Sequence, residues 1–118
     1  MMYNIKGTAL DITPELREYV EKKLDNLDTM FAHDDAVRTD VELEFLRGEA
    51  QTYRAEFMLH AAHLAEPLRT EVTGRTLHEA IDGATSELVR EAGRTKKKKI
   101  HVLRRGAAKV KEFLRGGK

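Results

Sequence analysis

Hydrophobic and polar residues alternate along this chain with two different periods, and the period predicts which segments are strands and which are helices. A period of two marks residues 3–7, 37–46, 53–61 and 68–73, which predicts four strands, each with one apolar and one polar face. Two other segments repeat apolar residues every three or four positions, as the buried face of a helix does. The first of these stripes is Leu16, Val20, Leu24, Leu27 and Phe31; the second is Leu77, Ala80, Ile81, Ala84 and Leu88.

Both predicted helices begin with capping residues. Thr13 stands before Pro14, which suits an N-cap followed by the first helical position. Thr76 and Glu79 have the spacing of a capping box, in which the threonine caps the helix and Glu79 binds the amide of Thr76. Gly48 lies between two alternating runs and predicts the turn of an antiparallel hairpin. The order β-α-β-β-β-α predicts an α+β fold, with a four-stranded sheet and two helices packed on one face.

The chain has 118 residues, the size of one ordinary domain. We place a domain at residues 1–95 and a basic C-terminal extension at residues 96–118. The apolar positions of the extension indicate a further amphipathic stretch: Ile100, Leu103, Ala107, Val110 and Leu114. No apolar run is long enough to span a bilayer, and residues 1–7 carry no signal-peptide pattern. We therefore expect a cytoplasmic protein without a membrane partner.

Charge is distributed unevenly along the chain, although the formal net charge is only +1. Residues 94–118 hold eleven Lys or Arg and one acid, Glu112, which gives +10. Residues 1–93 hold the other ten basic residues and nineteen acidic ones, which gives −9. A basic arm on an acidic body is typical of proteins that bind a polyanion, and we prefer this interpretation to a merely solubilising tail.

The residue types that most catalytic and metal sites need are missing or badly spaced. The chain has no cysteine, so it can form neither a disulfide nor a thiolate zinc site. His60 and His63 would point to opposite faces of a strand, and the single serine, Ser86, has no glycine-rich elbow around it. We therefore expect no enzyme, no metal, no cofactor and no small-molecule substrate.

Basic residues on the two predicted helices supply a candidate binding surface. Arg90 and Arg94 are four residues apart and share a helix face, while Lys22 and Lys23 lie on the outward side of the first helix. Cations on two adjacent helices suit phosphate neutralisation, and scarce aromatic residues argue against recognition by base stacking. We therefore predict contacts with the backbone and shape of folded RNA. The predicted RNA-binding residues are Lys22, Lys23, Arg90, Arg94, Lys96, Lys97, Lys98, Lys99, Arg104 and Arg105.

Two stretches of the chain carry a resemblance to one protein family. The first is Ile12-Thr13-Pro14-Glu15-Leu16-Arg17-Glu18-Tyr19-Val20, with Lys23, Leu27 and Phe31 after it. The second is Ala80-Ile81-Asp82, followed by Leu88, Arg90, Arg94 and the lysine run. Over residues 2–100 the chain resembles the ribosome hibernation-promoting factors, also called ribosome-associated inhibitor or sigma-54 modulation proteins. It departs from their pattern at Asn26, His78 and Glu87, and in its basic tail.

The resemblance implies a topology like that of a double-stranded-RNA-binding domain and a function in ribosome hibernation. Members of this family bind the small ribosomal subunit between head and body, occupy the space of tRNA and mRNA, and inhibit translation during stress or stationary phase. By this resemblance, Lys23, Arg90, Arg94, Lys97 and Lys98 would contact rRNA phosphates. The chain lacks the second, dimer-forming domain of long members, so we expect a short form that is monomeric off the ribosome.

Two other functions fit the same residues. The chain could be a general double-stranded-RNA-binding protein that is not tied to ribosomes. Alternatively, residues 94–115 could form a basic amphipathic helix that docks on a membrane or a protein partner. Co-sedimentation with ribosomes separates the first interpretation from these two, and liposome binding would identify the last.

Overall fold

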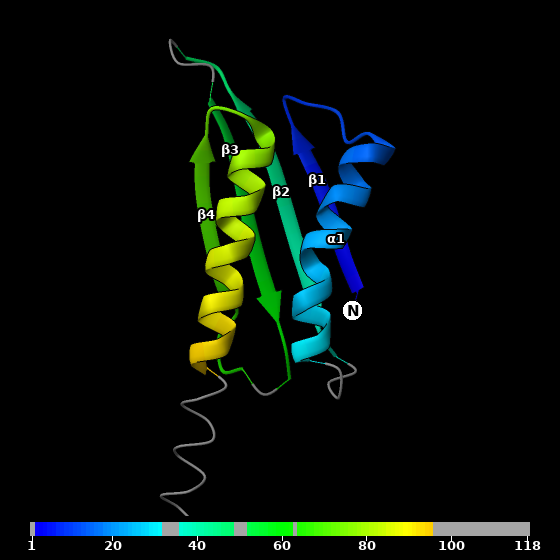
Figure 1. Cartoon of the computed structure of the whole chain (residues 1–118), viewed down its shortest axis with the longest axis vertical. Helices are drawn as coiled ribbons and strands as arrows, with labels where there is room; N and C mark the ends of the chain where they lie inside the picture. Colours follow the sequence, from blue (N-terminus) through cyan, green and yellow to red (C-terminus); the bar gives the residue numbers. More distant parts are fainter. Residues whose placement is uncertain (1, 32–35, 49–51, 63, 96–118) are drawn as a thin grey trace, which may run out of the picture.

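The computed structural model describes residues 2–31, 36–48, 52–62 and 64–95, and these residues contain four strands and two helices (Figure 1). In chain order the first five elements are β1 (Met2–Thr8), α1 (Pro14–Met30), β2 (Arg38–Leu46), β3 (Thr52–His60) and β4 (Leu68–Gly74). A second helix follows at residues 77–95, drawn from yellow-green to orange in Figure 1. The predicted element order and the α+β class are confirmed.

The strands form one mixed sheet in the order β1-β2-β3-β4. β1 and β2 are parallel, with Ile5 opposite Val41, because α1 carries the chain back along the sheet between them. The other two pairs are antiparallel: Val41 lies opposite Phe57, and Phe57 lies opposite Thr70. The predicted antiparallel hairpin is therefore confirmed, although residues 49–51 of its turn lie outside the described residues.

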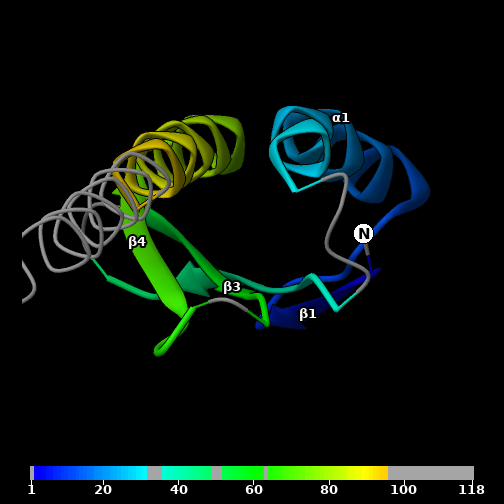
Figure 2. The ribbon, with the colours of Figure 1, turned by 90° about the horizontal axis from the view of Figure 1, so that it is seen from below.

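Both helices cover the same face of this sheet, as predicted (Figure 2). α1 lies over β1 and β2, and the second helix lies over β3 and β4 (Figures 1 and 2). The predicted apolar stripes form the core between the two layers: all their members are buried except Leu77 and Phe31, which are partly buried. The sheet contributes buried side chains of its own from the three strands β2, β3 and β4: Val41, Leu43, Ala55, Phe57, Leu59 and Thr70.

α1 starts at the predicted residue for the predicted reason. The Thr13 hydroxyl accepts a hydrogen bond from the backbone amide of Leu16 at 3.2 Å, and Pro14 takes the first helical position. The helix ends at Met30, where the amide of Phe31 still donates back to the last turn.

The second helix differs from its predicted capping box in one detail. The Thr76 hydroxyl accepts from the amide of Glu79 at 3.1 Å, as predicted. The Glu79 carboxylate, however, accepts from the amide of Arg75 at 3.1 Å and not from that of Thr76. The reason is that β4 ends at Gly74, so the Arg75 amide lies beyond the hydrogen-bond ladder of the sheet and takes the carboxylate as its acceptor.

Small residues let the second helix lie close to β4. Ala80 and Ala84 are fully buried on its inner face. A Cβ atom added to Gly83 would stand only 2.9 Å from Cγ1 of Val72 on β4. The Thr70 hydroxyl of β4 donates to the carbonyl of Ala84 at 2.9 Å, which satisfies a buried polar group at this contact.

The outer face of the sheet, which the helices leave uncovered, carries a network of ion pairs around Arg54. The Arg54 side chain is 16% exposed and pairs with Glu42, Glu44, Glu56 and Glu71. The strand register sets Glu42 opposite Glu56, and Glu56 opposite Glu71, so carboxylates face one another across the strands. Arg54 offsets this repulsion, and Arg69 does so as well by pairing with Glu56 and Glu71.

The predicted extension, residues 96–118, lies outside the described residues. Its division from a domain of residues 1–95 therefore stays a prediction, and so does the likeness to a double-stranded-RNA-binding domain. In the part of the chain that the structure describes, no helix is long and apolar enough to cross a membrane.

Candidate nucleic-acid interface

Four of the predicted RNA-binding residues lie in the described part of the chain: Lys22 and Lys23 on α1, and Arg90 and Arg94 on the second helix. The two helices start at the same end of the sheet, so their C-terminal ends also lie at one end of the molecule (Figure 1). The other six predicted residues lie outside the described residues: Lys96, Lys97, Lys98, Lys99, Arg104 and Arg105.

A groove of about 610 Å³ runs between α1 and the second helix. α1 lines it with Tyr19, Lys22, Lys23 and Asn26, and the second helix with Thr85, Ser86 and Val89. Its volume is in the range of small-ligand sites. The lining combines two lysines with amide and hydroxyl groups, a composition that suits a negatively charged, hydrogen-bonding group such as a phosphate.

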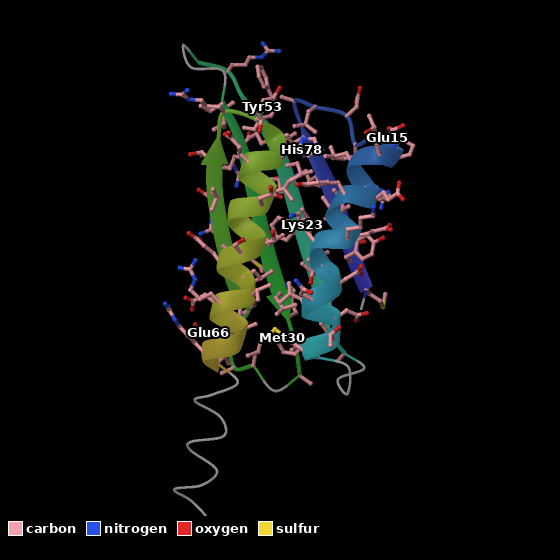
Figure 3. The ribbon with its side chains drawn as sticks, viewed as in Figure 1. Glu15, Lys23, Met30, Tyr53, Glu66 and His78 are labelled. Carbon is pink, nitrogen blue, oxygen red and sulfur yellow. The ribbon has the colours of Figure 1, made fainter. Side chains whose placement is uncertain are left out.

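Lys23 is held in this groove by residues of both helices. Its ammonium lies 3.1 Å from the Asp82 carboxylate and 5.5 Å from the centroid of the Tyr19 ring. The Tyr19 hydroxyl donates to the same carboxylate at 2.5 Å, and its ring meets His78 edge-on with the centroids 4.4 Å apart. Figure 3 shows Lys23 between the two helices and His78 nearer their N-terminal ends. We call Tyr19, Lys23, His78 and Asp82 the interhelix cluster.

This geometry differs from the predicted outward orientation of one of the two lysines. Lys22 is exposed at the rim of the groove, as expected for the outward side of α1. Lys23 is only 38% exposed and turns toward the second helix, because the carboxylate of Asp82 attracts its ammonium. The two neighbouring lysines therefore have different surroundings.

The contacts within the interhelix cluster also decide its protonation. The hydrogen bond from Tyr19, together with the nearby Lys23, lowers the pKa of Asp82 below its ordinary value against the effect of burial. The bond to Asp82 raises the pKa of Lys23 and, in the same way, raises the pKa of Tyr19. At neutral pH the lysine and the carboxylate are therefore both charged, and Tyr19 remains a hydrogen-bond donor.

Arg90 and Arg94 do not share the groove with the lysines. Arg90 lines a smaller hollow of about 280 Å³ between the second helix and β4, together with Arg69, Thr70, Glu87 and Glu91. Arg94 pairs with Glu91 at 2.7 Å. Because successive helix residues are rotated by about 100°, Arg90 turns away from the groove that Val89 lines. The structure thus places the predicted lysines and arginines at two separate sites.

The domain that carries these sites is acidic overall. Residues 1–95 hold eleven basic and nineteen acidic residues, a net charge of −8, whereas residues 96–118 hold ten basic residues and one acidic residue, a net charge of +9. Ion pairs with other described residues engage six of the eleven: Lys6, Lys23, Arg38, Arg54, Arg69 and Arg94. Attraction for a polyanion must therefore come mainly from residues 96–118 and from the basic residues that make no such pair.

Sequence reasoning did not place Tyr19, His78 or Asp82 in an interface, although a signal was present. Tyr19 and Lys23 are four residues apart, and so are His78 and Asp82, so each pair shares one helix face. The sequence could not show that these two faces meet, because this depends on how both helices pack on the sheet. Among the described residues, no three His, Cys, Asp or Glu side chains form a group that could hold a metal ion.

Comparison with known proteins identifies relatives along most of the chain. Residues 3–100 match the family described as "Sigma 54 modulation protein / S30EA ribosomal protein". The chain is 34% identical over 98 residues to the "Ribosome hibernation promotion factor" of Bacillus subtilis (strain 168), which covers 83% of this chain and 50% of that protein. It therefore spans about half the length of that relative. It is 32% identical over 104 residues to the "Ribosome hibernation promoting factor" of Azotobacter vinelandii, covering 85% of this chain and 87% of that one.

Two solved structures share the fold. The Protein Y N-terminal domain of Thermus thermophilus has a TM-score of 0.65 at 28% identity, over 80% of this chain and 97% of that one. A ribosomal subunit interface protein from Coxiella burnetii has a TM-score of 0.64 at 16% identity, over 82% and 99% of the two chains, and shows the fold alone. The match over residues 3–100 confirms the resemblance carried by the two helices: this chain belongs to the sigma 54 modulation protein / S30EA ribosomal protein family.

Proposed function

We propose that this chain is a ribosome hibernation factor, which acts in the cytoplasm during stress or stationary phase. It binds the rRNA of the small ribosomal subunit in the channel for tRNA and mRNA and thereby inhibits translation. The observation that carries this proposal is the family match over residues 3–100, supported by two relatives that are named for ribosome hibernation.

The charge distribution supports rRNA as the partner. A net charge of −8 on residues 1–95 repels a polyanion, and a net charge of +9 on residues 96–118 attracts it. The described chain ends at residue 95, at the end of the molecule where both helices finish (Figure 1). We therefore expect the protein to approach RNA with this end first. The outer face of the sheet, with its paired glutamates, lies on the side away from the helices (Figure 2).

The residues that face RNA in this proposal are ten basic side chains from the two helices and from residues 96–118. Phosphate contacts position a protein on RNA without reading its sequence, which suits these side chains. They are Lys22, Lys23, Arg90, Arg94, Lys96, Lys97, Lys98, Lys99, Arg104 and Arg105.

The test is the salt dependence of binding to purified small ribosomal subunits. Each duplex-type phosphate contact contributes about 0.9 to the slope of log affinity against log salt. Replacing all four lysines of residues 96–99 by glutamine in the full chain should therefore lower this slope by up to about 3.6. The same variant should inhibit cell-free translation less than the wild-type protein does.

A single-site control removes one cation from the sheet, away from the helices. Lys6→Gln removes a cation that is 76% exposed on β1 and only 3.7 Å from Glu42, and it should leave the slope unchanged. A wild-type slope near zero would contradict the electrostatic part of the proposal. Equal affinity for small subunits and for an unrelated RNA duplex would instead indicate a general double-stranded-RNA-binding protein.

A further inference from the structure

Lys22 and Lys23 are neighbours in the sequence, but among the described residues an acidic partner lies close to Lys23 and none pairs with Lys22. The Asp82 carboxylate lies 3.1 Å from the Lys23 ammonium. A phosphate that approached Lys23 would meet this carboxylate as well, and the repulsion between the two anions would offset much of the attraction. Lys23 is therefore a poor ligand for a phosphate while Asp82 is charged.

Lys22 has the opposite surroundings. It is exposed at the rim of the same groove and has no ion pair with any other described residue. Asn26 lies one helical turn further along α1 and Ser86 lies on the second helix, so an amide and a hydroxyl group line the same groove as Lys22. A lysine with two neutral hydrogen-bond donors nearby fits one phosphodiester group.

The interhelix cluster, in contrast, connects the two walls of the groove. Tyr19 and Lys23 come from α1, and both bind the Asp82 carboxylate of the second helix. The ring of Tyr19 also meets His78 of the second helix edge-on. These contacts hold the groove-lining faces of the two helices at a set distance, which orders the site before any ligand arrives.

We propose that the interhelix groove is a phosphodiester site in which Lys22 supplies the ionic contact, while Lys23 acts with Asp82 and Tyr19 as a positioning residue. The phosphodiester belongs to RNA, so the assignment rests on the proposed function. Both lysines remain in the RNA-facing set, but only one of them neutralises a phosphate. Lys23 contributes by setting the width of the groove.

Two variants of the full chain separate these roles. Lys22→Met should lower the slope of log affinity for small subunits against log salt by about 0.9 and leave the midpoint of thermal unfolding unchanged. The double variant Lys23→Met with Asp82→Asn removes one charge of each sign. It should weaken binding by a similar factor at every salt concentration, with an unchanged slope and a lower unfolding midpoint.

A third variant removes one bond of the cluster without any change of charge. Tyr19→Phe loses only the hydroxyl that binds Asp82, so it should resemble the double variant in a milder form. A slope that falls with the double variant, or stays constant with Lys22→Met, would overturn the assignment of the lysines. Unchanged unfolding midpoints in both cluster variants would overturn the positioning role. If the wild-type protein binds no small subunits at all, the proposed function fails and the phosphodiester assignment fails with it. The unfolding midpoints would still test whether the interhelix cluster holds the two helices together.

Discussion

Two glycines of the second helix offer a sharp test of how closely this helix packs on the sheet. Replacing either glycine by alanine should favour the helix by about 1 kcal/mol, because alanine has the higher helix propensity. At Gly83 the new Cβ would stand 2.9 Å from Cγ1 of Val72, a contact that real Cβ atoms do not make. At Gly93, apart from its own neighbours and the adjacent turns of helix backbone, no atom of the described residues lies within 4 Å of the new Cβ. The two substitutions should therefore have opposite effects.

The magnitude at Gly83 follows from what can move. The γ-carbons of Val72 are attached directly to its Cβ, and this branching restricts the χ1 angle, so the valine cannot rotate away without cost. Extra methyl groups in a packed contact typically cost about 1–3 kcal/mol. After the gain in helix propensity is subtracted, Gly83→Ala should lower the free energy of unfolding by up to about 2 kcal/mol, and Gly93→Ala should raise it by about 0.5–1 kcal/mol.

Denaturant unfolding of the two variants measures this difference directly. A further variant isolates the contact: in a Val72→Ala background the clash is gone, so Gly83→Ala should then stabilise the protein as Gly93→Ala does. If Gly83→Ala and Gly93→Ala stabilised the wild-type chain equally, the second helix would not lie as close to β4 as described, and the reasoning would be refuted.

Two further predictions concern polar groups on the sheet. Thr70→Val removes the hydroxyl that donates to the Ala84 carbonyl at 2.9 Å, and it should lower the free energy of unfolding by about 1–2 kcal/mol, whereas Thr70→Ser should lower it less. Arg54→Met leaves four carboxylates without their shared cation and should lower the free energy of unfolding by roughly 1.5–3 kcal/mol at pH 7. The Arg69 side chain is 55% exposed, so Arg69→Met should lower the free energy of unfolding by less than about 1 kcal/mol. Burial of Glu56 acts against its ionisation, but Arg69 and Arg54 outweigh burial and lower its pKa. The ion pairs of Glu56 therefore stabilise the fold above the unfolded pKa of this carboxyl, and the stabilisation is lost as pH falls through its folded pKa. Thermal unfolding should accordingly show that both arginine variants lose less stability, relative to the wild-type protein, below about pH 4 than at pH 7.

The faces of the elements could be predicted from the sequence because the backbone alone determines them. Side chains alternate along a strand and repeat about every 3.6 residues along a helix, whatever their partners are. Val41 and Phe57 were expected on the apolar face of the sheet, and both are buried. The start of α1 at Pro14 was equally predictable, because the cap of Thr13 is a contact within one turn of chain.

Contacts between elements were beyond such reasoning. Lys23 and Asp82 are far apart in the sequence and meet only because both helices pack on one face of the sheet, where Gly83 lets the second helix approach β4. Arg54 was expected on the polar face, but its four carboxylate partners depend on the strand register that sets Glu44 opposite it. Each of these pairings requires the tertiary structure before it can be named.

The pairing of charges within the domain has a consequence for how it can approach RNA. A domain whose whole surface is basic attracts a polyanion from every side. Here the glutamates around Arg54, and Asp82 beside Lys23, balance most of the local positive charge, and residues 1–95 keep a net charge of −8. The charge of the chain is therefore divided between an acidic domain and the basic residues 96–118. In the proposed function this division of charge orients the protein as it binds. The groove offers one lysine that makes no ion pair with another described residue, and this lysine adds a defined contact only after the basic residues 96–118 have been drawn to the RNA.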